Sequence, residues 1–199
     1  MPDIRSSAPA EGEVLSAVLA SAFNADPVMR WLFPDDAARR VRLRRFFANS
    51  ITRVNRGRRL IFAAGATEGA ALWDPPGSWR LGFWDQLRLA PAMLSTFGAR
   101  IFLVLKMIAE MEHRHLAEPH YYLFAVGTDP AAQGRGIGTA LLQPMLERCD
   151  RERLSAYLES SNPLNVPFYR RQGFEATGEL TLPGPNAPSL TLMRRTPRT

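Results

Sequence analysis

The sequence predicts an α/β fold, in which a sheet of six or seven strands has helices on both of its faces. Three observations support this prediction. Apolar runs of strand length alternate along the chain with segments of helical periodicity. The run 120–128 is apolar on both faces, as expected of a central strand covered on both sides. A glycine-rich turn then leads from this strand into a helical pattern over Gly136–Asp150.

The remaining elements follow from the same periodicities. Strands are expected near Ile4-Arg5 and over 60–64, 68–73, 120–128, 154–158, 174–182 and 189–194. Helices are expected over 11–23, 35 to about 55, 83–94, 100–116, 136–150 and 163–172. Val28–Pro34 is a dense apolar segment between the first two helices. We see no internal repeat and no second domain, so residues 1–199 are expected to form a single domain.

Size and composition are those of a globular protein. The chain has 199 residues, of which 46% are hydrophobic and 22% charged, enough for one well-packed core. No apolar run is long enough to span a bilayer, and the N-terminal residues lack an apolar signal segment. The lone Cys149 excludes an internal disulfide and lies on the apolar face of a predicted helix. We therefore expect a cytoplasmic protein with no membrane partner.

The net charge of +6 comes from 25 basic residues, of which only Lys106 is a lysine. The arginines gather at Arg39-Arg40, Arg42, Arg44-Arg45, Arg56 and Arg58-Arg59. Such groups bind nucleic acid or other anions in some proteins, and in others they form the solvated face of a helix. No zinc-ligand spacing or RNA-binding aromatic motif accompanies them, so we expect the solvated face and no nucleic-acid partner.

The most informative stretch is the glycine-rich loop that follows the central strand. Gln133-Gly134-Arg135-Gly136-Ile137-Gly138 stands at the start of a helix, where glycines let backbone N–H groups approach an anion closely. This pattern indicates a pyrophosphate cradle, with a plain tight turn as the alternative. The loop lacks the lysine of a Walker motif, and its glycine spacing differs from that of the dinucleotide fingerprint.

Read from Gln133, the loop fits the pattern Q-x-x-G-x-G/A and resembles the coenzyme A loop of the GNAT superfamily of N-acetyltransferases. Glu159-Ser-Ser-Asn162 and Phe168-Tyr169-x-x-x-Gly173-Phe174 resemble the second half of the same domain, so the likeness covers about residues 120–178. It implies a mixed, mostly antiparallel sheet in which strands 121–128 and 154–159 diverge toward their C-terminal ends. It also implies an acetyl-CoA-binding half, 120–199, and an acceptor-side half, 1–119, with a helical insertion over 79–117.

The resemblance implies which residues hold the co-substrate. The backbone groups of Val126 and Thr128 would bond the pantetheine arm, and Asn162 or Asn165 would add a side chain to it. The pyrophosphate would lie on the loop, and its residues are Gln133, Gly134, Arg135, Gly136, Ile137, Gly138 and Thr139. Arg135 either adds charge to a phosphate or faces solvent. We expect acetyl-CoA as co-substrate and no metal.

The chemistry needs an acid for the departing thiolate and a base for the amine. Tyr169 follows Asn162 at the spacing of the family's proton-donating tyrosine, although a tyrosine at this place can also anchor the core. The base is either Glu159, at the end of a predicted strand, or His120, at the start of another. Each of these has a structural alternative, an ion pair for Glu159 and an exposed strand edge for His120.

For the acceptor, the aromatic residues Trp31, Phe33 and Trp73 are candidates to wall a pocket, with ordinary core positions as the alternative. The segment from Tyr121 onward most resembles puromycin N-acetyltransferase-like members, which implies transfer to the primary amine of a small molecule by direct attack in a ternary complex. Acetylation of a protein N-terminus or lysine, and a non-catalytic acyl-CoA sensor, remain alternatives. A monomer or a homodimer is expected.

Overall fold

The computed structural model describes residues 2–7, 9–52, 59–80 and 82–198. In this part of the chain, seven strands form a single sheet in the order β1-β2-β3-β4-β5-β7-β6. The strands are β1 (Ile4–Ser6), β2 (Leu60–Ala64), β3 (Gly69–Asp74), β4 (His120–Thr128), β5 (Ser155–Ser160), β6 (Glu175–Thr181) and β7 (Ser189–Arg195). Only β4 and β5 run parallel, and every other neighbouring pair is antiparallel. The predicted mixed and mostly antiparallel sheet is confirmed.

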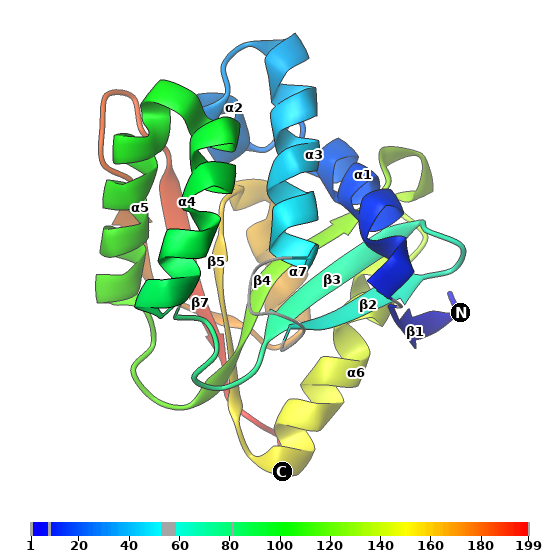
Figure 1. Cartoon of the computed structure of the whole chain (residues 1–199). Helices are drawn as coiled ribbons and strands as arrows, with labels where there is room; N and C mark the ends of the chain where they lie inside the picture. The colour runs from blue at the N-terminus through cyan, green and yellow to red at the C-terminus, as the bar shows by residue number, and fades with distance from the viewer. Residues whose placement is uncertain (1, 8, 53–58, 81, 199) are drawn as a thin grey trace.

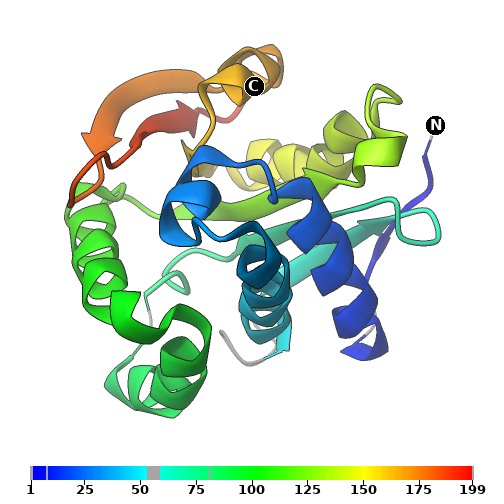
Figure 2. The same ribbon diagram turned by 90° about the horizontal axis from the view of Figure 1, so that it is seen from above.

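Helices cover both faces of this sheet (Figures 1 and 2). They are α1 (Gly12–Ala22), α2 (Pro27–Leu32), α3 (Asp36–Thr52), α4 (Phe83–Phe97), α5 (Ile101–Arg114), α6 (Ile137–Glu152) and α7 (Val166–Arg171). One buried cluster joins the sheet to α1–α3 and to the inner sides of α4 and α5. A second cluster joins the opposite face to α6 and α7, and it contains the buried Cys149. The central strands are therefore covered on both sides.

Most of the expected elements are present. Strands 60–64 and 120–128 begin and end where the sequence predicts, and the short strand near Ile4 is β1. Helix α2, which was not predicted, begins at Pro27 and covers the first part of the apolar segment Val28–Pro34. Asp26 starts this helix, because its carboxylate accepts hydrogen bonds from the backbone N–H groups of Val28 and Met29. The predicted end of the second helix near Asn55, together with Arg56 and Arg58, lies outside the described residues.

The insertion between β3 and β4 is a pair of helices that lie side by side (Figure 1). Phe83–Arg114 has the length and apolarity of a membrane span. Its most apolar 18 residues have a mean hydropathy of 1.6, and 22% of them are buried. However, the chain turns back at Gly98, where φ is +55°. Helices α4 and α5 have 15 and 14 residues, about 22 Å each, which is shorter than the hydrocarbon core of about 30 Å.

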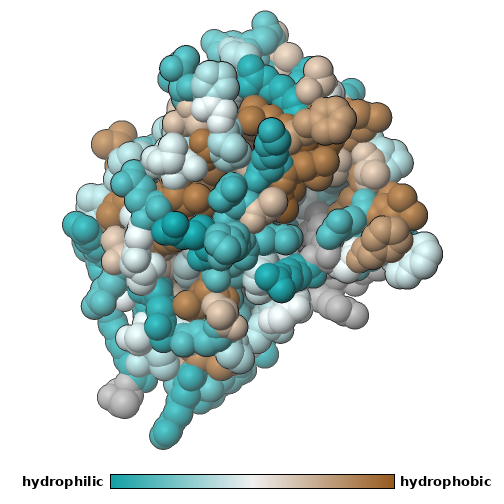
Figure 3. Space-filling model, turned by 90° about the vertical axis from the view of Figure 1, so that its left-hand side faces the viewer, coloured by the Kyte–Doolittle hydropathy of each residue, from teal (hydrophilic) through white to brown (hydrophobic). Residues whose placement is uncertain are grey.

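The outer side of this helix pair exposes apolar side chains. Figure 3 shows apolar surface broken by polar side chains on this side of the molecule. The exposed large side chains of α4 and α5 are Phe83, Trp84, Leu87, Leu94, Phe102 and Leu105. Along α5, Ile101, Ile108 and Met111 pack against the first cluster, whereas Leu105 is 51% exposed.

A buried ion pair fixes the end of β3 to the chain that follows α3. The Arg59 guanidinium donates to both carboxylate oxygens of Asp74, at 2.7 and 2.6 Å, and to the carbonyl oxygen of Ser50 at 3.1 Å. Both side chains are at most 3% exposed. The guanidinium also lies 4.0 Å from the ring centroid of Phe124, the extra residue of a β-bulge between β3 and β4.

Removing one partner of this pair leaves an unpaired buried charge. We therefore expect Asp74→Ala to lower the free energy of unfolding by about 3–5 kcal/mol. Denaturant unfolding measures this loss. Arg88→Ala is the control, because Arg88 pairs with Asp85 at the surface at 3.7 Å and should change stability by less than about 1 kcal/mol. A loss for Asp74→Ala as small as that of the control would contradict this interpretation.

Candidate active site

The two central strands separate halfway along their length. β4 and β5 pair only at His120–Ser155, Tyr121–Ala156 and Tyr122–Tyr157. Beyond this point β4 continues to pair with β3 as far as Thr128, and β5 continues to pair with β7 as far as Ser160. The predicted divergence of these strands toward their C-terminal ends is confirmed.

The register of β4 shows which backbone groups face the opening. Asp129 N–H donates to the carbonyl oxygen of Glu68 at 2.8 Å, directly after the register pair Thr128–Gly69. Residues of an antiparallel strand direct their N–H and C=O groups alternately toward and away from the partner strand. Since Asp129 faces β3, the backbone groups of Val126 and Thr128 face away from it, toward β5. No register pair with β5 reaches them.

The glycine-rich loop lies at the end of this opening and leads into α6. Gly134 and Gly136 both have φ of +77°, and no atom lies within 4 Å of where a Cβ would stand at either position. Loop residues 133–136 are exposed, whereas Ile137 is buried and anchors the first turn of α6 in the core. The first N–H groups of a helix have no partner within it, so this loop fits an anionic group.

Two loop side chains have partners within the protein. Arg135 donates to the Glu68 carboxylate at 2.6 Å, in an exposed ion pair. Thr139 accepts a hydrogen bond from the Gln172 side chain at 3.2 Å, which joins the start of α6 to the end of α7. Gln133 is exposed. A phosphate bound by Arg135 would have to compete with Glu68 for the guanidinium.

Tyr169 lies in α7 beside the end of β5 and is 9% exposed. Burial raises the pKa of its hydroxyl, and the nearby Asp26 carboxylate raises it further. The hydroxyl therefore keeps its proton at neutral pH. Asp26 in turn accepts a hydrogen bond from Ser161, so the corner between α1 and α2 is fixed to the residue that follows β5.

The two asparagines take part in the turn between β5 and α7. Asn162 accepts a hydrogen bond from Leu164 N–H at 3.0 Å through its side-chain oxygen. Asn165 stands before α7 and is exposed.

Both candidate bases belong to one buried network. Glu159 Oε1 lies 3.1 Å from His115 Nδ1, and His115 Nε2 lies 3.0 Å from His120 Nε2. His120 Nδ1 lies 2.6 Å from the carbonyl oxygen of Glu118. Burial lowers the pKa of His120, so this imidazole is neutral at physiological pH. Both of its nitrogens have partners, which leaves neither free for a substrate.

Glu159 has an oxygen without a partner. Its side chain is 2% exposed, and its Oε2 is buried with no hydrogen-bond partner in the described part of the chain. The same is true of the Tyr157 hydroxyl. Burial raises the pKa of Tyr157 and of Tyr122, and the Glu159 carboxylate beside them adds to both shifts. Glu159 is thus the member of the network that can still accept a proton.

Trp79 lies over this network. Its ring stacks on that of His115, with 3.6 Å between ring centroids and 25° between the planes. Among the described residues, no group of three or more His, Cys, Asp or Glu side chains is arranged to hold a metal ion. Glu159 and His120 are joined through His115, which lies between them.

The three aromatic candidates for the acceptor pocket lie apart. Trp31 donates its indole N–H to the carbonyl oxygen of Pro185 at 3.1 Å. Phe33 stacks on Phe97, with 5.5 Å between centroids, and borders a hollow of about 290 Å³ between α2–α3 and the turn after α4. Trp73 is fully buried in the cluster under α6, which is the ordinary core position given as the alternative for these residues. The reason is that β3 is buried on both faces, and Trp73 points to the α6 side.

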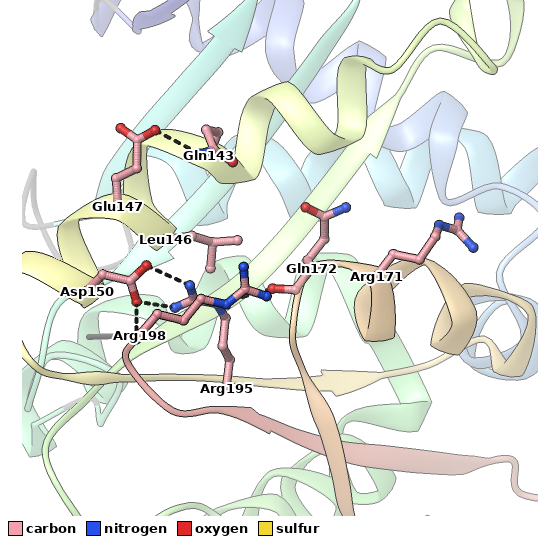
Figure 4. Close-up of a pocket in the computed structure, with 8 residues that line it drawn as sticks. All are labelled: Gln143, Leu146, Glu147, Asp150, Arg171, Gln172, Arg195 and Arg198. Atoms are coloured by element: carbon pink, nitrogen blue, oxygen red, sulfur yellow. Dashed lines mark hydrogen bonds and ion pairs between the residues drawn. The ribbon is translucent and has the colours of Figure 1, made fainter.

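A second hollow, of about 100 Å³, lies between α6, α7 and the end of β7 (Figure 4). Arg195 crosses it and donates two hydrogen bonds to Asp150, each 2.7 Å long. None of the residues expected to bind acetyl-CoA or the acceptor lines this hollow. Its charged walls serve to join the C-terminal strand to α6.

The sequence analysis did not single out His115, Asp26 or Ser161. One signal was available for His115, because all three histidines of the chain fall within residues 113–120. The contact between Asp26 and Ser161 joins segments 135 residues apart, and no local pattern marks it.

Comparison with known proteins agrees with this geometry. Residues 100–174 match the acetyltransferase (GNAT) family. An uncharacterised N-acetyltransferase of Schizosaccharomyces pombe is 28% identical over 197 residues, which covers 92% of this chain and 79% of that protein.

Two solved structures are also similar. A histone acetyltransferase HPA2 and related acetyltransferase from Corynebacterium glutamicum has a TM-score of 0.74 and 27% identity, over 100% of this chain and 97% of that chain. A phosphinothricin acetyltransferase from Sinorhizobium meliloti, solved with acetyl-CoA, has a TM-score of 0.54 and 17% identity, over 98% and 88%. The chain is therefore similar to the GNAT family of acetyltransferases in sequence over residues 100–174, and to solved acetyltransferases in fold over its whole length.

The buried Asp26 carboxylate gives a prediction about stability and pH. Burial raises its pKa, so the folded protein binds this proton more tightly than the unfolded chain does. Its contribution to stability is therefore present at low pH and is lost as the pH rises above about 4, through its folded-state pKa. Asp26→Asn keeps the oxygen that starts α2 and removes the charge.

We expect Asp26→Asn to be more stable than the natural protein at pH 7, with the difference closing near pH 4. Denaturant unfolding at pH 7 and at pH 4 measures the difference in the free energy of unfolding between the two proteins. Asp26→Ala is the matched control, because it loses the charge and also the cap of α2, and it should be about 1 kcal/mol less stable than Asp26→Asn. A constant difference between Asp26→Asn and the natural protein at both pH values would contradict the assignment.

Proposed function

We propose that this protein transfers the acetyl group of acetyl-CoA to the primary amine of a small molecule, by direct attack in a ternary complex. The observation that carries the proposal is the opening between β4 and β5. The glycine-rich loop lies at one end of it, the backbone groups of Val126 and Thr128 are directed into it, and the unpaired oxygen of Glu159 belongs to β5.

The co-substrate would be held mainly by main-chain groups. Loop residues 133–138 and Thr139 are the proposed pyrophosphate site, because the space beside Gly134 and Gly136 is open and the loop leads into the first turn of α6. Val126 and Thr128 would bond the pantetheine arm as an additional strand would. Asn162 and Asn165, on the turn after β5, are proposed to contact the same arm.

Transfer needs one proton taken from the amine and one given to the sulfur. We assign the first task to Glu159, since both nitrogens of His120 are already bonded. An ammonium group that loses its proton to Glu159 Oε2 becomes a nucleophile for the thioester carbonyl. We assign the second task to Tyr169, whose hydroxyl remains protonated because burial and Asp26 raise its pKa.

Two features support a small-molecule acceptor. The segment from Tyr121 onward has the motif pattern of puromycin N-acetyltransferase-like members. The base is also only 2% exposed, and Trp79 stacks on its partner His115, so we expect a slender amine to be favoured. A protein acceptor is the second candidate, because the similar structure from Corynebacterium glutamicum is described as a histone acetyltransferase and related acetyltransferase. A lysine side chain is slender as well. Comparing small amines with lysine peptides as acceptors therefore distinguishes the two candidates.

Binding of acetyl-CoA tests the loop. At Gly136, an added Cβ would occupy the open space beside the loop and shift the loop out of its left-handed conformation, so Gly136→Ala should weaken binding roughly tenfold in a calorimetric titration. Gly98→Ala is the matched control, since Gly98 also has a positive φ and open space but lies at the turn between α4 and α5. Equal loss in both variants would show that backbone strain acts through overall stability, and no binding by the natural protein would refute the loop assignment.

Release of free thiol in the presence of amines tests the reaction. We expect release with a panel of small primary amines, and a tenfold or larger decrease in turnover for Tyr169→Phe with little change in fold. Tyr121→Phe is the control, because the Tyr121 hydroxyl bonds Glu152 of α6, away from the opening. Unchanged turnover in Tyr169→Phe would remove Tyr169 from the mechanism. Release with lysine peptides alone would select the protein acceptor, and binding without any release would favour an acyl-CoA sensor.

A further inference from the structure

The network of Glu159, His115 and His120 fixes where its protons lie. The carbonyl oxygen of Glu118 only accepts hydrogen bonds, so His120 Nδ1, 2.6 Å away, carries a hydrogen. Burial lowers the pKa of His120, which favours the neutral ring, and in the neutral ring Nε2 is an acceptor. The hydrogen in the 3.0 Å contact between the two imidazoles must then belong to His115 Nε2.

One proton remains to be placed, between His115 Nδ1 and Glu159 Oε1, which are 3.1 Å apart. Without it, a lone pair of His115 would face a carboxylate oxygen, and two buried acceptors would repel each other. Either His115 is an imidazolium facing a carboxylate, or a neutral His115 faces a protonated Glu159. The two arrangements contain the same number of protons and differ only in where one of them lies. Only the first leaves Glu159 able to accept a proton.

Three observations favour the ion pair. The side chains of His115 and Glu159 are 3% and 2% exposed, and a carboxylate buried to this degree needs a positive partner to stay ionised. The face of Trp79 lies on the His115 ring, with 3.6 Å between centroids, and an aromatic face favours a cation. The Tyr122 and Tyr157 hydroxyls also lie beside the Glu159 carboxylate, and hydroxyl donors of this kind suit an ionised acceptor.

We propose that His115 is a positioning residue which, as an imidazolium, holds Glu159 in its ionised and basic form. This inference rests on the proposed function, and it adds a residue that makes no contact with either substrate. When a substrate ammonium gives up a proton, its N–H bond breaks and an O–H bond forms at Glu159 Oε2. His115 keeps its own two protons throughout, and its charge favours the return of Glu159 to the carboxylate after the product leaves.

Other charged and titratable groups surround the pair on every packed element. They are Arg114 and Glu118 before β4, His120 and Tyr122 on β4, Tyr157 on β5, and Asp74 with Arg59 at the end of β3. Asp74 and Arg59 bond each other, and Glu118 pairs with Arg194. Arg114 acts on Tyr157, whereas His115 is the basic side chain that contacts Glu159 directly.

The pH dependence of kcat/KM for amine, at saturating acetyl-CoA, tests the proposal. An amide nitrogen in His115→Asn can still donate to Glu159 but carries no charge. Since the base must be deprotonated to act, loss of the facing cation should move the acid limb about one to three pH units upward. The curves should converge at high pH, and His115→Ala should behave in the same way with a lower maximum. A uniform loss at all pH values, with the acid limb unmoved, would reduce His115 to a structural role.

A second measurement needs no variant and no activity. Nitrogen-15 NMR of the imidazole side chains in the natural protein should find His115 protonated at both nitrogens at pH 7 and His120 neutral with its proton on Nδ1. A neutral His115 at that pH would overturn the proposal. Because this readout involves neither acetyl-CoA nor an amine, it separates a failure of this inference from a failure of the proposed function.

Discussion

The separation of β4 from β5 is the constraint on which the rest of the site depends. The two strands share three register pairs and then follow different neighbours, β3 on one side and β7 on the other. The bulge at Phe124 comes just after the last shared pair, and a bulge increases the local twist of its strand. Arg59 lies over the Phe124 ring and bonds Asp74, so the place where the sheet opens is held by a buried charge pair.

Around this opening, the protein keeps several ionisable groups out of water and provides each with a partner. Asp26 is compensated by two backbone N–H groups and Ser161, Asp74 by Arg59, and Glu159 by His115. Burying a charge is unfavourable unless it is paired and hydrogen-bonded, so each of these pairs restricts how the surrounding elements are placed. The corner between α1 and α2, the end of β3 and the end of β5 are fixed to their neighbours in this way.

The sequence was sufficient for the elements that carry strong local signals. Strands 60–64 and 120–128 and the glycine-rich loop were predicted because apolar runs of strand length and glycine spacing are local properties. The six residues of α2 are too few to display a period. The side to which Trp73 points was not predictable either, since β3 is buried on both faces and alternation carries no information there. His115 meets Glu159 across 44 residues of sequence, a contact that only the folded chain brings about.

The direction of the backbone groups at Val126 and Thr128 has a consequence for how such a site persists as a sequence changes. Their N–H and C=O groups face the opening because of the register with β3, whatever side chains these positions carry. Only proline, which lacks the N–H group, would remove a donor outright. Many substitutions at these two positions are therefore silent with respect to the opening, and residue identity there says little about whether a related chain retains it.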